Sequence, residues 1–213
     1  MAAQTQSLRT NVIKTKIDKS QTDSACRMCK QKDETISHIV SECTKLAMKE
    51  YKRRHDCVAR ALHWDLLRQN GFHHSDKWYQ HEPEAVVEDD HHKILWDFAI
   101  QTDREITARR PDIVVINKDT KSCHIIDVAI PGDARIVTKQ EEKIDKYQDL
   151  AREIRSLWKV KAKVIPIVIG ALGTIPKGLN GYLKEIGVTT RVELLQKSAL
   201  LGTARTLRMV LET

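Results

Sequence analysis

The sequence lacks the features that mark several common classes of protein. No apolar run approaches the length of a membrane span, and residues 1–7 contain no apolar segment of the kind found in secretory signals. No glycine is followed by Lys-Ser or Lys-Thr, so no nucleotide-binding P-loop is present. Only five cysteines occur, an odd number that argues against a disulfide framework and for a reducing compartment. We therefore expect a soluble protein that is neither secreted nor inserted in a membrane.

The composition is that of a folded protein with a moderately basic surface. The 213 residues are 41% hydrophobic and 31% charged, which is enough for one full domain and a small second module. The 36 lysines and arginines outnumber the 29 aspartates and glutamates and give a formal net charge of +7. This charge is compatible with a nucleic-acid partner, but a moderate charge alone is a weak indication.

Four potential zinc ligands near the N-terminus have the spacing C-x2-C-x8-H-x4-C. They are Cys26, Cys29, His38 and Cys43. Zinc prefers four sulfur and nitrogen ligands in a tetrahedron, and this set supplies them. We expect Asp33 to cap a short helix over residues 34–41 that presents the histidine. The alternative is a reduced Cys-x-x-Cys pair beside a surface histidine.

Two short apolar segments flank a polar turn at residues 117–121 and predict a β-hairpin. A turn centred on Asp119 and Thr120 places Asp112 opposite Asp127. Facing side chains in a hairpin lie about 5 Å apart at Cβ on one side of the sheet, where two carboxylates repel each other. A divalent cation between them would remove the repulsion, because hard cations take oxygen ligands. A turn of odd length would instead send the two acids to opposite faces.

The hairpin also carries a resemblance to a known family. Pro111-Asp112, followed after fourteen residues by Asp127 on an apolar strand, resembles the core motif of restriction-like PD-(D/E)xK nucleases. The chain looks most like the version at the C-terminus of site-specific non-LTR retrotransposon polyproteins, which also carry a CCHC zinc motif upstream of the nuclease. The resemblance covers about residues 8–212. It implies an α/β fold with an αβββαβ core, in which helices flank a mixed sheet and a small zinc-binding helical module precedes it.

The periodicity of the apolar residues agrees with this order of elements. Besides the hairpin we expect helices over 45–56, 57–69, 84–90, 136–158 and 189–211, and strands over 93–102 and 163–169. Pro166 indicates an edge position or an irregularity in the last of these strands. We divide the chain into a flexible tail (1–20), a zinc module with a basic helical linker (21–82) and a restriction-like endonuclease domain (83–213).

The resemblance assigns Asp112, Asp127 and the carbonyl of Val128 to a catalytic Mg²⁺. The third residue of the family motif is a lysine two positions after the second acid, and this chain has Ala129 there. Without a cation beside the attacking group the site would be weak.

Related retrotransposon nucleases carry this lysine on the following helix, where the chain offers Lys139, Lys143 and Lys146. The buried stripe of that helix is centred near Lys143, so we expect Lys143 to be the catalytic lysine and Lys146 to be second. The alternative is that these lysines only flank the stripe and are solvated.

Two basic clusters are candidates for nucleic-acid binding. They comprise Lys52, Arg53, Arg54 and His55 between the modules, and Arg109 and Arg110 before the hairpin. An Arg-His-Asp tripeptide at the first place also occurs in the retrotransposon enzymes, where it is linked to nucleic-acid binding. The alternative is a solvated charged face.

These features together predict a Mg²⁺-dependent DNA endonuclease with a structural Zn²⁺ in its upstream module. By resemblance it nicks target DNA for target-primed reverse transcription, in the nucleus or otherwise in the cytoplasm. No Tyr-x-Asp-Asp motif occurs, so we expect a piece detached from its reverse transcriptase. The expected partners are DNA, the element's RNA as a further candidate, and the reverse transcriptase portion of the parent polyprotein. The alternative is an inactive or domesticated zinc-containing remnant that only binds nucleic acid.

Overall fold

The protein is built on a mixed β-sheet. The structure, a computed structural model, describes residues 2–189 and 191–212. In this part of the chain the sheet has five strands in the order β1-β2-β3-β4-β5. They are β1 (Val86–Glu88), β2 (His92–Trp96), β3 (Ile113–Asn117), β4 (Ser122–Ala129) and β5 (Lys161–Val168). Strands β1 to β4 pair antiparallel, whereas β5 lies parallel to β4 because a helical crossover connects them.

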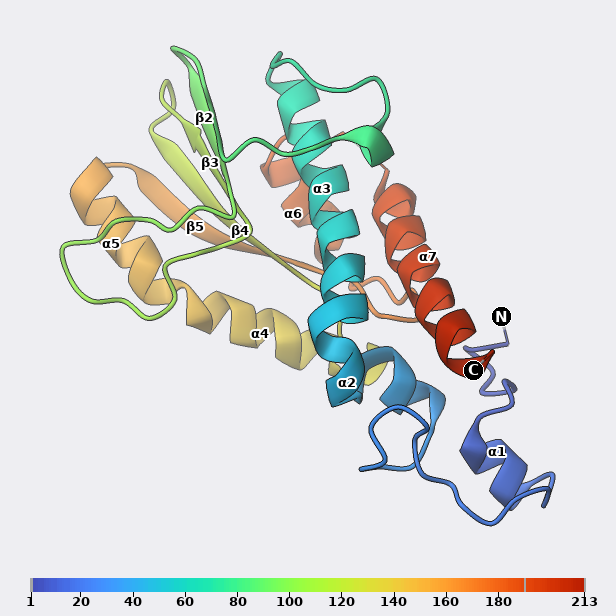
Figure 1. Ribbon diagram of the computed structural model, residues 1–213. Helices are drawn as coiled ribbons and strands as arrows, with labels where there is room; N and C mark the ends of the chain where they lie inside the picture. Colours follow the sequence, from blue (N-terminus) through green and yellow to red (C-terminus); the bar gives the residue numbers. More distant parts are fainter. Residues whose placement is uncertain (1, 190, 213) are drawn as a thin grey trace.

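Helices cover both faces of the sheet (Figure 1). Helices α3 (Lys52–Gln69), α6 (Leu179–Glu185) and α7 (Val192–Leu211) share one buried cluster with every second residue of the central strands. The alternate residues of the same strands pack against α5 (Gln148–Trp158), which α4 (Ile136–Lys146) precedes. This alternation follows from the two-residue period of a β-strand.

The N-terminal quarter of the chain forms a smaller unit beside these layers. Its elements are α1 (Asn11–Lys16), a π-helical turn (His38–Glu42), α2 (Thr44–Leu46) and a second π-helical turn (Ala47–Tyr51). Short 3-10 turns at Trp78–Gln80 and Asp133–Arg135 complete the elements of the described residues. No described helix is long and apolar enough to cross a membrane.

The predicted α/β class, with helices flanking a mixed sheet, is confirmed. The hairpin register is also confirmed, since Ile116 pairs with Cys123 and Asn117 with Ser122. The edge position indicated by Pro166 is correct, because β5 is the last strand of the sheet.

Three predicted elements near the sheet are wrong. Residues 84–90 contain strand β1 (Val86–Glu88) rather than an acidic helix, because pairing with β2 and ion pairs from Lys93 and Lys118 to Glu88 outweigh the local helix preference. The predicted strand over 93–102 ends at Trp96, and Asp97 then takes a left-handed conformation with φ 44°. The predicted helix over 136–158 is interrupted at Tyr147, between α4 and α5.

The helices around the zinc motif also differ from the prediction. The side chain of Thr35, not Asp33, accepts from the backbone N–H of His38 at the start of the helical turn. The predicted boundary between helices over 45–56 and 57–69 is wrong, since helix α3 continues through these residues. Helix α3 does end before Gly71, whose φ of 74° suits glycine at this position.

Helices α3 and α7 cross in close contact at Arg54 and Gly202. A Cβ atom on Gly202 would lie 2.8 Å from Cβ of Arg54 and 3.2 Å from its Cα, so the crossing requires a glycine there. The Arg54 guanidinium donates to the Thr203 hydroxyl at 2.9 Å and to the carbonyls of Val40 at 2.8 Å and Ile130 at 3.2 Å. Arg54 therefore connects the smaller N-terminal unit, the segment after β4 and helix α7.

Replacing Arg54 with alanine should destabilise the protein strongly. The side chain is 1% exposed, and its loss leaves a cavity and removes the donor to three acceptors. We expect the free energy of unfolding to fall by on the order of 3 kcal/mol or more, measured by urea denaturation. Arg53→Ala, at the exposed neighbouring position, is the control and should change stability by less than about 0.5 kcal/mol. Equal effects of the two substitutions would contradict this role.

Candidate functional site

The two acids of the hairpin lie at the same end of the sheet. Asp127 is on β4, and Asp112 immediately precedes β3. The register pairs Ile113 with Ile126, and its continuation by one residue brings Asp112 opposite Asp127. Ile126 packs with α3 and α7, so the alternation of β4 turns Asp127 toward the other helical layer. The odd-turn alternative is thereby excluded.

Asp112 is held through one oxygen of its carboxylate. The backbone N–H of Val128 donates to Oδ2 at 2.6 Å, and His55 Nε2 lies 3.0 Å from the same atom. Among the described residues, no hydrogen bond reaches the other oxygen, Oδ1. The Asp112 side chain is 21% exposed, so solvent still reaches this carboxylate. The arrangement leaves one carboxylate oxygen available to a ligand.

Asp127 is buried and faces lysines from α4. Its side chain is 3% exposed, and Lys143 Nζ forms an ion pair with its Oδ2. Lys146 Nζ lies 3.8 Å from Oδ1 and is more exposed. Lys139, one turn earlier, pairs instead with Glu142 at 2.6 Å. Lys143 is thus the lysine of α4 that comes nearest to Asp127. Its positively charged amine lies beside this carboxylate and offsets its negative charge.

Tyr147 lies at the junction of α4 and α5 beside both acids. Burial raises the pKa of its phenol well above the usual range, and the negative charges of Asp127 and Asp112 raise it further. The hydroxyl donates to the Arg110 carbonyl at 3.1 Å and accepts from Lys146 Nζ at 2.9 Å. The phenol therefore stays protonated and fixes the start of the segment that leads into β3.

His55 joins the site from the opposite helical layer. It lies in the first turn of α3. Its Nε2 is 3.0 Å from Asp112 Oδ2, and its Nδ1 is 3.0 Å from Asp56 Oδ1. Burial disfavours the charged imidazole, but hydrogen bonds to Asp112 and then Asp56 outweigh it and raise the pKa of His55 to about 10. The sequence analysis missed this contact, since only the folded chain brings α3 to the end of β3.

The basic cluster on α3 does not form one surface. Lys52 and Arg53 are exposed, and Lys52 lies 3.7 Å from Asp56. The prediction that Arg54 contacts nucleic acid is wrong, because its side chain is buried against α7. Burial lowers the pKa of Arg54 to about 10, so it remains charged at neutral pH. Successive helix residues are about 100° apart, which separates these four side chains.

The second basic cluster lies next to the acids. Arg109 and Arg110 are exposed in the segment before β3. The Arg110 guanidinium donates to both carboxylate oxygens of Asp97, at 2.8 and 2.9 Å. This pair holds the end of β2 against the start of the hairpin, and both arginines remain accessible to a ligand.

The N-terminal cluster brings the four predicted zinc ligands together. The ligand atoms of Cys26, Cys29, His38 and Cys43 all lie within 4.8 Å of one another, and all four residues are buried. The Cys26 and Cys43 sulfurs are 3.9 Å apart, and Cys29 Sγ is 3.2 Å from His38 Nε2. Three sulfurs and one imidazole nitrogen converging in a buried site fit a metal such as zinc.

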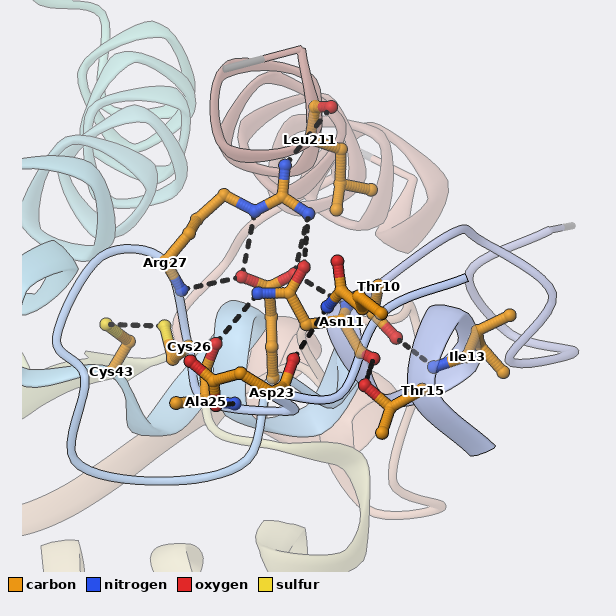
Figure 2. Close-up of polar contacts among 12 residues, drawn as sticks. Thr10, Asn11, Ile13, Thr15, Asp23, Ala25, Cys26, Arg27, Cys43 and Leu211 are labelled. Atoms are coloured by element: carbon orange, nitrogen blue, oxygen red, sulfur yellow. Dashed lines mark hydrogen bonds and ion pairs between the residues drawn. The ribbon is translucent and has the colours of Figure 1, made fainter. Parts of the chain in front are cut away.

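A buried ion pair ties the loop of this cluster to both ends of the chain. Arg27 forms a bidentate contact with Glu34, at 2.7 and 2.9 Å, and Glu34 also accepts from the backbone N–H of Asn11. Burial opposes the charge on Glu34, but the hydrogen bonds from Arg27 lower the pKa of its carboxyl. Figure 2 shows the Arg27 side chain between Asn11 and Leu211, to whose carbonyl it donates at 3.5 Å.

No protein-family model matches the chain, and no curated protein matches it. The function therefore has to be argued from the residues themselves. Two groups of residues are candidates for a site. The acids with Lys143 offer carboxylate oxygens, and the Cys/His cluster offers mainly sulfur atoms.

Proposed function

We propose that this chain is a Mg²⁺-dependent DNA endonuclease with a structural zinc module, of the restriction-like type found in non-LTR retrotransposon polyproteins. The observation that carries the proposal is the meeting of Asp112, Asp127 and Lys143 at one end of the sheet. Oxygen ligands suit a hard divalent cation, and a lysine beside them suits an anionic substrate. The βββαβ part of the family order supports it, because β2, β3, β4, α4–α5 and β5 follow one another in the chain. The helix that precedes them is α3, with β1 between α3 and β2.

Asp112 and Asp127 would hold the Mg²⁺, with the carbonyl of Val128 as the further ligand that the resemblance implies. When bound, the ion would polarise the phosphate and help to activate the attacking water. The Val128 N–H and His55 keep Asp112 in place, so the acid need not reorganise during the reaction. Lys143 would exchange its contact with Asp127 for one with the phosphate and stabilise the charge that develops there. Water adds to phosphorus, the bond to the 3′ oxygen breaks, and that oxygen takes a proton.

The Cys/His cluster would bind Zn²⁺ and shape the unit beside the nuclease. By resemblance the nicked 3′ end primes reverse transcription in the nucleus, with the reverse transcriptase portion and the element's RNA as partners. Lys52, Arg53, Arg109 and Arg110 are exposed and are proposed to contact the DNA backbone. Such contacts bind all sequences alike and weaken as salt rises.

Conversion of supercoiled plasmid to the open circle tests the proposed activity. We expect nicking by the purified full chain in buffer with Mg²⁺ and none in the same buffer without it. Asp119→Asn, at the exposed tip of the same hairpin, is the control for changes in this element. DNA binding without nicking under any divalent cation would favour the binding-only alternative.

Lys143→Ala should lower the nicking rate by about 10²-fold, the scale of one electrostatic contact in a preorganised site. The reason is its contact with Asp127 and its low exposure of 16%. Lys139→Ala, on the same helix but paired with Glu142, is the matched control and should keep nearly full activity. Initial rates on plasmid, with binding followed by fluorescence anisotropy, make the comparison. Full nicking by Lys143→Ala would defeat the assignment.

A further inference from the structure

Two side chains at the start of α3, Asp56 and His55, form a series of hydrogen bonds that ends at Asp112. Asp56 Oδ1 lies 3.0 Å from His55 Nδ1, and His55 Nε2 lies 3.0 Å from Asp112 Oδ2. Both imidazole nitrogens are therefore engaged, which fixes the orientation of the ring. The side chains are partly buried, with 28% of His55 and 34% of Asp56 exposed.

These contacts determine which oxygen of Asp112 is free. His55 and the Val128 N–H both address Oδ2, from α3 and from β4. A carboxylate held by two donors on one oxygen cannot rotate about its last bond without breaking both hydrogen bonds. Oδ1 is then left without a hydrogen bond from the described residues, beside the end of β4, where Asp127 precedes Val128 and pairs with Lys143.

We infer that His55, oriented by Asp56, is a positioning residue that aims Asp112 at a divalent cation. The inference rests on the proposed function and extends it to α3, whose Arg-His-Asp tripeptide the sequence analysis had assigned to nucleic acid. Outer partners of this kind orient metal-binding carboxylates, and their loss typically costs 10- to 100-fold in metal affinity or activity. The basic neighbours are not equivalent to His55, because Arg53 is exposed and Arg54 is buried against α7.

The test is the binding of Mn²⁺, a substitute for Mg²⁺, measured on the zinc-loaded full chain by the loss of the free-ion EPR signal. We expect His55→Ala to weaken Mn²⁺ binding about 10- to 100-fold. His55→Gln retains an amide donor and should recover part of the affinity. Asp56→Ala removes only the orienting partner and should give a smaller loss. Lys49→Ala, at an exposed position just before α3, is the control and should bind Mn²⁺ like the wild type.

Duplex DNA binding without a divalent cation, followed by anisotropy, separates the two roles of the tripeptide. His55→Ala should bind DNA like the wild type. Unchanged Mn²⁺ affinity in both His55→Ala and Asp56→Ala would overturn the inference, and weakened DNA binding would return His55 to nucleic-acid contact. Absence of Mn²⁺ binding by the wild type would overturn the proposed function itself, so the two failures are distinguishable. Should His55→Ala fail to fold, His55→Gln and Asp56→Ala still decide the outcome.

Discussion

Asp127→Asn should abolish nicking while DNA binding persists. The substitution keeps the size of the side chain but removes the charge that faces Lys143 at the buried end of β4. An amide is a poor ligand for Mg²⁺ compared with a carboxylate, and Lys143 would lose the partner that holds it at the site before the phosphate binds. We expect the nicking rate to fall by about 10³-fold or more, which combines loss of a metal ligand with loss of one electrostatic contact.

The control is again Asp119→Asn, whose carboxylate is 60% exposed and pairs with His91 at the hairpin tip. It should nick plasmid at the wild-type rate. Because Asp127 is buried, the melting temperature of Asp127→Asn has to be measured, and the rate compared at a temperature where both proteins are folded. A folded Asp127→Asn protein with wild-type nicking would remove the proposed metal site and leave the binding-only alternative.

The features that local chemistry determines could be predicted from the sequence. The polar turn at 117–121 sets the hairpin register, which in turn brings Asp112 and Asp127 to the same end of the sheet. The spacing of Cys26, Cys29, His38 and Cys43 is sufficient to bring their ligand atoms together. The period of the helix after the hairpin points Lys143 toward the sheet. In each case neighbours within a few turns of chain decide the geometry.

The features that depend on distant partners could not be predicted. His55 meets Asp112 across 57 positions of sequence, and Arg54 meets Thr203 across 149. A run of basic residues predicts a charged surface when its neighbours in space are unknown. In the structure α7 covers Arg54, because Gly202 allows the two helices to approach closely. Strand β1 was missed for the same reason, since the acidic residues among 84–90 are compatible with a helix until β2 offers a partner strand.

Replacement of Cys43, a proposed zinc ligand, should unfold a defined part of the chain. Structural zinc contributes on the order of 10 kcal/mol to the folding of isolated fingers. Burial raises the pKa of the Cys43 thiol to about 11, and bound zinc would supply the charge that stabilises its thiolate. We expect Cys43→Ser to lose the roughly one zinc per chain that elemental analysis should find in the wild type. Cys57→Ser, a partly exposed thiol outside the cluster, is the matched control and should keep it.

The extent of the unfolding follows from what packs on the cluster. Leu207 and Val210 near the end of α7 share its apolar core, and Arg27 links it to Asn11 and the Leu211 carbonyl. The sheet has separate cores on its two faces, which contain none of the four ligands. Hydrogen exchange of Cys43→Ser should therefore lose protection over residues 8–51 and 205–211 but keep it in β3 and β4. Protection that is unchanged at both ends of the chain, or lost equally in the sheet, would contradict this division.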